Sequence, residues 1–331
     1  MSDTLPSSMK VVAAAAPGGP EVLQPAERPL PGVEPGEVLV KVAAAGVNGP
    51  DLWQRKGLYP APAGATDLLG LEISGEVVAR GKDAARWKVG DKIVALTNGG
   101  GYAQYCVVDA RHCLPVPASV NLQDAAGLPE TFFTVWSNIF MTARLVAGET
   151  LLVHGGAGGI GTTAIQLAKA FGAKVIATDS PESRCRICRD LGADRVIDYR
   201  SEDFVEIVRN EGGANVILDI VGGPNIERNI KAASHDGRIV QLAFGQGSKV
   251  EINLMPVMLK RLTYTGSTLR SRSPAFKAKI AEELEAKVWP HIASGRIRTV
   301  TGRTFPLEDA AKAHALMESS EHTGKILLTV N

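Results

Sequence analysis

The sequence predicts an α/β protein of two domains, in which a barrel-like domain is followed by a doubly wound parallel sheet. Two observations lead to this fold class. Residues 9–130 are rich in glycine and proline and contain short apolar runs, whereas from about Val135 apolar strands alternate with helical patterns at the spacing of βαβ units. The length of 331 residues agrees, because one domain usually has about 100–200 residues.

In the first domain, each strand is predicted from a short apolar run. Several short strands in a glycine- and proline-rich stretch are typical of a barrel. The runs are residues 38–42, 73–78, 92–96 and 102–108.

The second domain is predicted to begin with a strand over 150–154 and a helix after it. Three- and four-residue spacing marks the apolar face of that helix, at Ile160, Ala164, Leu167, Ala168 and Phe171. A second strand covers 174–178. The helix that follows has start and stop signals, with Ser180 as N-cap, Pro181 as first helical residue and Gly192 as the stop.

The same alternation continues toward the C-terminus. The order of a doubly wound sheet is completed by strands over 195–198, 216–219 and 238–242, with helices that begin near Ser201 and Asn225. A helix over 274–292 and a last strand over 325–330 can return the chain to the first domain. We therefore predict a first domain of residues 1–130 with 273–331, and a second of residues 131–272.

Composition narrows the function classes. The 36 Lys and Arg residues against 35 Asp and Glu leave a net charge of +1, which gives no electrostatic reason to expect nucleic acid or an anionic membrane as a partner. The longest uncharged stretch, 150–168, is interrupted by glycines and a histidine, and the N-terminus has no signal-sequence pattern. Four cysteines suit a reducing compartment. We expect a cytoplasmic protein.

A glycine-rich loop stands between the first strand and the first helix of the second domain. It contains the pattern G-x-G-x-x-G at Gly156, Gly158 and Gly161, in the strand and helix context of a dinucleotide site. Gly156 is expected to permit the tight turn, Gly158 to let the backbone approach a pyrophosphate, and Gly161 to let the helix lie close to the strand. The phosphates would face the free N–H groups of the helix, next to the other loop residues Ala157, Gly159 and Ile160.

Two residue types near this loop have open interpretations. His154 is expected to make a local hydrogen bond, with catalysis as the alternative. Cys185 and Cys188 have the spacing of a redox or metal pair, but they lie in a predicted helix without a second pair of ligands. We expect them to pack against the core.

Several segments spread over nearly the whole chain match one known family. They are 17–23, 46–48 with Asp51, 57–60, 70–72, 90–91, the glycine loop with 166–169, and 324–326. With these segments the chain resembles the zinc-free quinone oxidoreductases of the medium-chain dehydrogenase/reductase family, the zeta-crystallin-like proteins. The resemblance implies a GroES-like domain built from both chain ends, a Rossmann domain between them, a nicotinamide cofactor and a homodimer.

The resemblance also indicates the catalytic positions. The three metal ligands of related zinc alcohol dehydrogenases are replaced by Asn48, Leu71 and Glu130. Leucine has no lone pair, so no metal is expected. Without a Lewis acid, reduction of an electron-poor acceptor is favoured over alcohol oxidation. Asn48 and Tyr59 match positions that face the substrate, where an amide and a phenol can stabilise a quinone oxygen. The alternatives are a turn residue and a loop anchor.

Further cofactor contacts are implied by position alone. They are Thr134, Phe244, Gly245, Leu269 and Lys325. Alternative roles remain open, because Thr134 can bond its own backbone, Leu269 can belong to the core and Lys325 can be a solvated strand end.

The sequence gives two opposite signals on which nicotinamide is used. Asp179 follows Gly161 by 18 residues, where an acid binds the ribose hydroxyls of NAD. Ser180, Arg184 and Tyr199 match family positions that hold the phosphate of NADP. The alternatives are that Asp179 turns away as a helix cap and that Arg184 is a solvated helix residue. On family grounds we expect NADPH, with NADH accepted because of Asp179.

The sequence therefore favours an NAD(P)H-dependent, zinc-independent quinone oxidoreductase. An alkenal or enone double-bond reductase is the first alternative. A structural or regulatory nicotinamide-binding protein, like a crystallin, is the second, and the even charge balance disfavours RNA as its partner.

Overall fold

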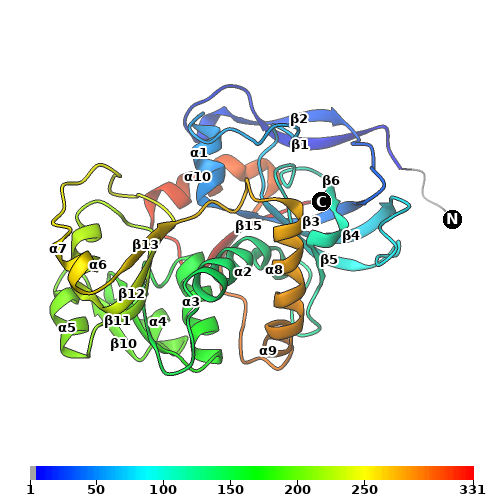
Figure 1. The fold of residues 1–331 in the computed structure, drawn as a ribbon. Helices are drawn as coiled ribbons and strands as arrows, with labels where there is room; N and C mark the ends of the chain where they lie inside the picture. The colour runs from blue at the N-terminus through cyan, green and yellow to red at the C-terminus, as the bar shows by residue number, and fades with distance from the viewer. Residues whose placement is uncertain (1–4) are drawn as a thin grey trace. The chain divides into compact units, whose positions relative to one another are not determined.

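The computed structural model describes residues 5–331, which form two compact units. Unit 1 contains the described residues up to Phe133 together with Arg270–Asn331, and unit 2 is Thr134–Leu269. The chain thus leaves unit 1 once and returns to it once, as the colours of Figure 1 show. No helix in the described part of the chain is both long enough and apolar enough to cross a membrane.

Unit 1 is built on a seven-stranded sheet in the order β14-β15-β3-β4-β5-β7, with β6 also paired to β3. All four apolar runs predicted in this unit form strands. The members are β3 (Glu37–Val47), β4 (Glu72–Arg80), β5 (Lys92–Leu96), β6 (Tyr105–Asp109), β7 (Cys113–Pro115), β14 (Thr301–Pro306) and β15 (Lys325–Thr329). A separate antiparallel pair consists of β1 (Ser8–Ala14) and β2 (Leu23–Pro29).

Strand β15, near the C-terminal end of the described residues, belongs to this sheet. Strand β15 lies antiparallel to β3, with Ile326 opposite Val47. This register brings Lys325 next to the C-terminal end of β3, where Asn48 precedes helix α1 (Gly49–Arg55). Two distant parts of the sequence therefore meet at one edge of the candidate site.

Four more α-helices lie in unit 1 or, in the case of α2, extend from it into unit 2. They are α2 (Pro129–Val135), α8 (Pro274–Lys287), α9 (Trp289–Ala293) and α10 (Ala310–Ser319). The single helix predicted over 274–292 is wrong, because the chain breaks at Val288 into α8 and α9. Pro290 explains the break, since its ring has no N–H to donate and collides with the preceding turn of a continuing helix.

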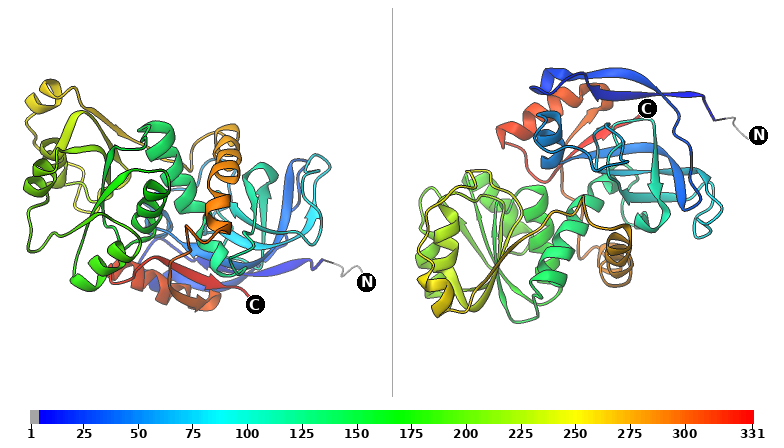
Figure 2. Two further views of the ribbon diagram at one scale, coloured as in Figure 1. Left: turned by 90° about the horizontal axis from the view of Figure 1, so that it is seen from below. Right: turned by 45° about the horizontal axis from the view of Figure 1, so that its top comes forward.

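Unit 2 contains a six-stranded parallel sheet in the order β10-β9-β8-β11-β12-β13. Figure 2 shows helices on both sides of it. The strands are β8 (Thr150–His154), β9 (Lys174–Asp179), β10 (Arg195–Asp198), β11 (Ala214–Asp219), β12 (Ala233–Gln241) and β13 (Thr263–Gly266). The helices are α3 (Gly159–Ala170), α4 (Glu182–Asp190), α5 (Phe204–Asn210), α6 (Asn225–Ala232) and α7 (Met255–Leu259), with a π-helix over Trp136–Thr142.

Two predicted helix starts in unit 2 are wrong. Helix α4 begins at Glu182, because Pro181 is extended at φ −79° and ψ −170° and takes the N-cap position itself. The hydroxyl of Ser180, the predicted cap, is buried and bonds no described residue. Helix α5 begins at Phe204 instead of near Ser201, because the carboxylate of Asp203 accepts a hydrogen bond of 2.8 Å from the backbone of Val205 and caps the helix there.

Candidate active site

The glycine loop of unit 2 has the close contacts that its sequence implies, with one correction. The left-handed residue of the turn is Gly155, at φ +70°, so the turn does not depend on Gly156. Gly156 is needed for packing, because a Cβ there would lie 2.7 Å from the sulfur of Cys188. At Gly161 a Cβ would lie 2.3 Å from the carbonyl oxygen of Gly155, which would push helix α3 away from the strand.

The loop fits the phosphates of a dinucleotide. A Cβ at Gly158 would meet only the Gly155 oxygen, at 3.5 Å, so glycine here leaves open space instead of serving internal packing. The first three N–H groups of α3, those of Gly159, Ile160 and Gly161, have no acceptor among the described residues. Free N–H groups at the positive end of a helix, beside an open backbone, are the features that bind a pyrophosphate.

Asp179 and Arg184, the two conflicting cofactor signals, form an ion pair with each other. The Arg184 Nε donates to Asp179 Oδ1 at 2.6 Å. The same carboxylate accepts from the backbone N–H of Ala157, at 2.7 Å, and of Ser180, at 2.8 Å. Asp179 therefore holds the glycine loop to the end of β9, and Arg184 neutralises part of its charge.

The other residues predicted to contact the cofactor lie at several places in unit 2. Tyr199 is exposed, and its backbone N–H donates to Asp179 at 3.3 Å. Phe244 is exposed and Gly245 follows it, beyond the C-terminal end of β12. Leu269 is buried. The Thr134 hydroxyl makes no hydrogen bond with a described residue, so the alternative that it bonds its own backbone is wrong.

His154 makes the local hydrogen bonds expected of it. Its Nε2 lies 2.7 Å from Asn229 Oδ1 and its Nδ1 lies 2.8 Å from the Thr178 hydroxyl. Asn229 in turn donates to Asp219 at 2.9 Å, which fixes its oxygen toward the imidazole, so Nε2 carries the proton. Burial lowers the pKa of His154. Both ring nitrogens of His154 are thus bonded inside the unit, which leaves neither for catalysis.

Cys185 and Cys188 pack inside the unit, as predicted. Both side chains are buried on α4, and both thiols are reduced. Burial raises the pKa of Cys188 to about 12, so its thiol stays protonated.

In unit 1, Asn48 and Lys325 meet at a buried carboxylate that the sequence did not single out. The ammonium of Lys325 lies 2.6 Å from Glu72 Oε1 and 2.6 Å from Asn48 Oδ1. The Asn48 amide donates to Glu72 at 2.9 Å, with a longer contact of 3.4 Å to Gly46. Lys325 is 7% exposed, which excludes a solvated strand end. Its neighbour relation to Asn48 could not be predicted because it depends on the β15–β3 register.

Asp51 fixes the backbone around these residues. Its carboxylate accepts from the N–H groups of Asn48 and Gly70, both at 2.9 Å. Burial raises the pKa of Asp51 to about 6, against the lowering effect of these two hydrogen bonds. Asp51 thus orders the backbone at Asn48 and Gly70.

Tyr59 and Arg270 form the side of this site at which polar atoms lack a hydrogen-bond partner in the described chain. The Arg270 guanidinium lies 5.6 Å from the centre of the Tyr59 ring. Its Nε and Nη2 donate to the carbonyl of Asn98, at 3.1 and 2.5 Å, while its buried Nη1 has no partner in the described chain. The Tyr59 hydroxyl also bonds no described residue, and burial raises its pKa.

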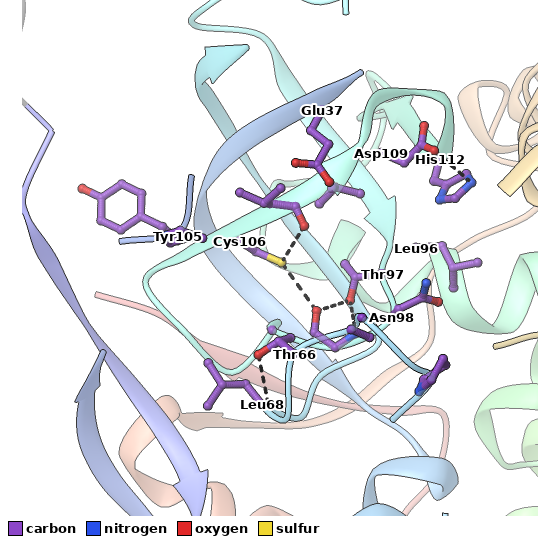
Figure 3. A pocket seen from close by; sticks show the side chains of 18 of the residues that line it. Glu37, Thr66, Leu68, Leu96, Thr97, Asn98, Tyr105, Cys106, Asp109 and His112 are labelled. Atoms are coloured by element: carbon purple, nitrogen blue, oxygen red, sulfur yellow. Dashed lines mark hydrogen bonds and ion pairs between the residues drawn. The ribbon is translucent and has the colours of Figure 1, made fainter. Parts of the chain in front are cut away.

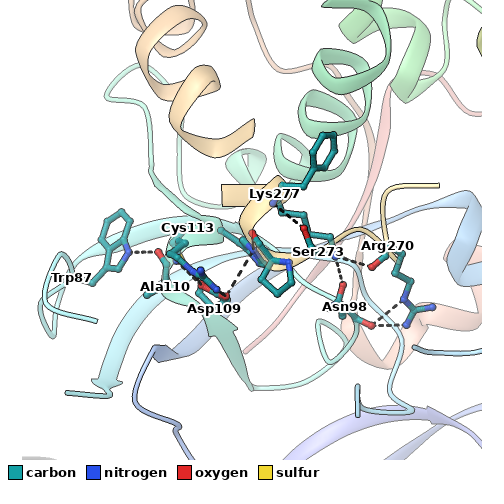
Figure 4. Close-up of polar contacts among 12 residues, drawn as sticks. Trp87, Asn98, Asp109, Ala110, Cys113, Arg270, Ser273 and Lys277 are labelled. Carbon is teal, nitrogen blue, oxygen red and sulfur yellow. Dashed lines mark hydrogen bonds and ion pairs between the residues drawn. The ribbon is translucent and has the colours of Figure 1, made fainter. Parts of the chain in front are cut away.

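Lys277 is a second buried cation near Arg270. Its ammonium donates to Asn98 Oδ1 at 2.6 Å and to the Arg270 carbonyl at 2.8 Å (Figure 4). Both acceptors are neutral, and burial lowers the pKa of Lys277 to about 8. Arg270, Lys277 and Asn98 were not found from the sequence, because no motif marks them.

The donor set here does not fit a zinc ion. Of the three positions that hold ligands in zinc relatives, Leu71 is buried and has no donor atom. The described residues contain no group of three or more His, Cys, Asp or Glu side chains arranged to hold a metal. The ammonium of Lys325 already stands between Glu72 and Asn48, so a metal cation bound to them would meet like charge.

A cavity of about 530 Å³ opens elsewhere in unit 1 (Figure 3). The cavity is lined by loop residues around Thr66 and Asn98, by the thiol of Cys106 and by the imidazole of His112. None of the side chains predicted to face the substrate lines this cavity. We therefore do not assign it to the acceptor.

Comparisons with known proteins agree with this architecture. The family described as zinc-binding dehydrogenase matches residues 159–286, and the alcohol dehydrogenase GroES-like domain matches residues 34–118. The mouse quinone oxidoreductase is 31% identical over 319 residues, which cover 94% of this chain and 95% of that protein.

Three solved structures are similar over nearly the whole chain. An NAD-dependent alcohol dehydrogenase is 31% identical with a TM-score of 0.87, covering 98% of this chain and 100% of that one. A mycobacterial protein complexed with NADPH is 28% identical with a TM-score of 0.86, covering 97% and 99%. The CurK enoyl reductase is 25% identical with a TM-score of 0.86, covering 98% and 100%. The chain belongs to the medium-chain dehydrogenase/reductase family, among the quinone oxidoreductases.

Proposed function

We propose that the protein is a zinc-independent NAD(P)H:quinone oxidoreductase. The observation that carries this proposal is the Lys325 ammonium, which lies 2.6 Å from Glu72 and 2.6 Å from Asn48, and Asn48 is one of the three positions matched to metal ligands of zinc relatives. A resident ammonium and a leucine cannot supply a Lewis acid for alcohol oxidation. An electron-poor quinone can accept a hydride without one.

The roles of the unit 1 side chains follow from their partners. Tyr59 has a hydroxyl without an internal acceptor, so we assign it as the donor to the acceptor's oxygen. The Asn48 amide already donates to Glu72, so we propose that Asn48 positions Lys325 and the loop instead of binding the quinone directly. Lys325 is likewise proposed as a positioning residue and not as a cofactor contact.

The nicotinamide cofactor supplies the hydride when it is bound. We propose that the glycine loop with Ser180, Arg184 and Tyr199 holds it, and that Thr134, Phe244, Gly245 and Leu269 border it through backbone or apolar contacts. The ion pair with Arg184 reduces the repulsion that Asp179 would exert on a 2′-phosphate. We therefore propose a mild preference for NADPH, with NADH also used.

A double-bond reductase is the second candidate. The similarity to an enoyl reductase supports it, as does the chemistry, because an enone is also an electron-poor hydride acceptor. The same residues would serve both reactions, so only turnover distinguishes them.

The deciding experiment is a steady-state assay of the purified protein with a quinone, an enone and a primary alcohol, each with both nicotinamides, together with elemental analysis. We expect NAD(P)H-dependent quinone reduction that a chelator does not inhibit. One zinc per chain with chelator-sensitive turnover would contradict the proposal.

We also propose a homodimer, formed along the exposed edge strand β13. This strand pairs only with β12 in the described sheet. Exposed apolar side chains gather in the neighbouring segment, namely Leu254, Met255, Met258, Leu259 and Tyr264. Light scattering should give twice the mass of the chain, and Met258→Glu should give the mass of one chain.

A further inference from the structure

Glu130 is a carboxyl group that the proposed function leaves without a task. It lies in the first turn of α2, and its backbone N–H donates to Glu72 Oε2 at 2.8 Å. Its own carboxyl oxygens make no hydrogen bond or ion pair with a described residue, and the side chain is only half-buried. A carboxyl group in this position is accessible to a bound molecule.

Burial and the neighbouring side chain of Glu72 keep the proton on Glu130. Glu72 is fully buried, and its oxygens accept hydrogen bonds from Asn48, Lys325 and the Glu130 backbone. A second negative charge beside it is unfavourable. Burial, and next the charge of Glu72, raise the pKa of Glu130 to about 8.

Glu130 shares its surroundings with the two residues at the open side of the site. The titratable and charged groups that interact electrostatically with it are Asp51 of α1, Glu72 of β4, Lys277 of α8, Lys325 of β15, and Tyr59 and Arg270 of two loops. The carboxylate form of Glu130 raises the pKa of Tyr59 and also acts on Arg270. The acid, the phenol and the guanidinium are therefore near enough in unit 1 to influence one another.

We propose that Glu130 is the proton donor of the reduction. This step rests on the proposed function. The acceptor gains a hydride from the reduced nicotinamide, whose C–H bond breaks and which is thereby oxidised. The O–H bond of Glu130 breaks and a new O–H bond forms on the acceptor's oxygen, giving the quinol or the enol. Glu130 is left as the carboxylate and regains its proton from water.

The chemistry explains why a carboxylic acid suits this metal-free site. Negative charge develops on the acceptor's oxygen as the hydride arrives, and a proton donor neutralises it at that moment. A metal ion performs the same neutralisation in Lewis-acid catalysis. Arg270 and Tyr59 can hold the oxygen while the proton moves.

The test is Glu130→Gln, compared with the wild type and with Glu130→Asp. At pH 7 we expect kcat to fall by about 100-fold or more in Glu130→Gln and to recover in part in Glu130→Asp. The wild-type kcat should decline as pH rises through about 8, where the acid form is lost, and Glu130→Gln should lack this decline. Since the pKa of Lys277 is also about 8, the variant and not the wild-type profile assigns the group.

Two readouts separate proton donation from a structural role. The Kd for NADPH, measured by fluorescence titration, should be unchanged in Glu130→Gln. The infrared C=O band of a protonated carboxyl group should be present in the wild type at pH 7 and weaker in the variant. Glu76→Gln makes the same chemical change at an exposed position of β4 and should leave kcat and its pH profile as in the wild type.

The outcomes distinguish this proposal from the proposed function. If the wild type reduces neither quinones nor enones, the function is wrong. If the wild type is active but Glu130→Gln keeps both the rate and the decline near pH 8, Glu130 is not the donor and the proposed function stands.

Discussion

Two buried arginines of unit 1 lie in very different surroundings. Arg55 is 1% exposed, and all of its donor nitrogens have partners, namely the Gly18 carbonyl at 3.0 Å, His314 Nδ1 at 3.2 Å and Glu318 at 2.6 Å. Arg270 is 7% exposed, donates only to a neutral carbonyl and has one nitrogen without a partner.

The partners of each arginine repeat the contrast. His314 bonds the Tyr102 hydroxyl at 2.9 Å, and burial, followed by the charge of Arg55, lowers its pKa to about 3, so it stays neutral between fixed partners. Around Arg270 stand a phenol and a carboxyl group without internal partners, Tyr59 and Glu130. A buried charge with every bond satisfied holds the fold, whereas unsatisfied buried polar groups indicate a place where a ligand completes the bonding.

The largest effect is expected from breaking the satisfied network. Arg55→Met leaves the Gly18 carbonyl and His314 Nδ1 without this buried donor, whereas Glu318 keeps Lys56 at 2.7 Å, and the free energy of unfolding should fall by about 4 kcal/mol. Arg86→Met, which removes an exposed arginine paired with Glu285, should cost about 1 kcal/mol or less. Urea denaturation measures both. Equal losses of unfolding free energy in Arg55→Met and Arg86→Met would contradict the stabilising role of the buried Arg55 network.

The next effect concerns the open side of the site. Tyr59→Phe removes a hydroxyl that bonds nothing inside the protein, so stability should be unchanged. Turnover with a quinone should fall, because the activation free energy rises by about 3 kcal/mol in a site without water and by less in a hydrated one. Steady-state kinetics and urea denaturation of the same preparation check this. Wild-type kinetics would return Tyr59 to the role of a loop anchor.

The smallest effect concerns cofactor choice. Arg184→Ala removes the cation that neutralises Asp179 and should shift the ratio of kcat/KM for NADPH and NADH toward NADH by about tenfold, which corresponds to about 1.4 kcal/mol. Arg189→Ala, on the same helix but paired with exposed Glu182, is the matched control. An unchanged ratio in Arg184→Ala would show that this guanidinium does not act on the 2′-phosphate.

The fold was largely predictable because local patterns determine it. The strand at 150–154 was predicted with its exact bounds, since a buried parallel strand is a continuous apolar run. The errors occurred where single residues decide, as at Pro181, Asp203 and Pro290. There one residue shifts a helix start, by one position at Pro181 and by about three at Asp203, or divides a helix, as at Pro290.

The site was predictable only in part. The glycine loop is contiguous in sequence, so its pattern could be read directly. The contact of Lys325 with Asn48 depends on the register of two strands more than 270 residues apart, and the exposure of Glu130 to Arg270 depends on tertiary packing. A motif search of the sequence can predict neither the Lys325–Asn48 contact nor the surroundings of Glu130.

The position of Lys325 after the whole of unit 2 has a consequence for the order of events during synthesis. Unit 2 is complete at Leu269, so all of its strands can pair while the ribosome is still extending the chain. The sheet of unit 1 lacks β15 until residues 325–329 have been made, and until then Glu72 is without the ammonium of Lys325. In a nascent chain, unit 2 can thus fold before the buried contacts among Glu72, Asn48 and Lys325 can form.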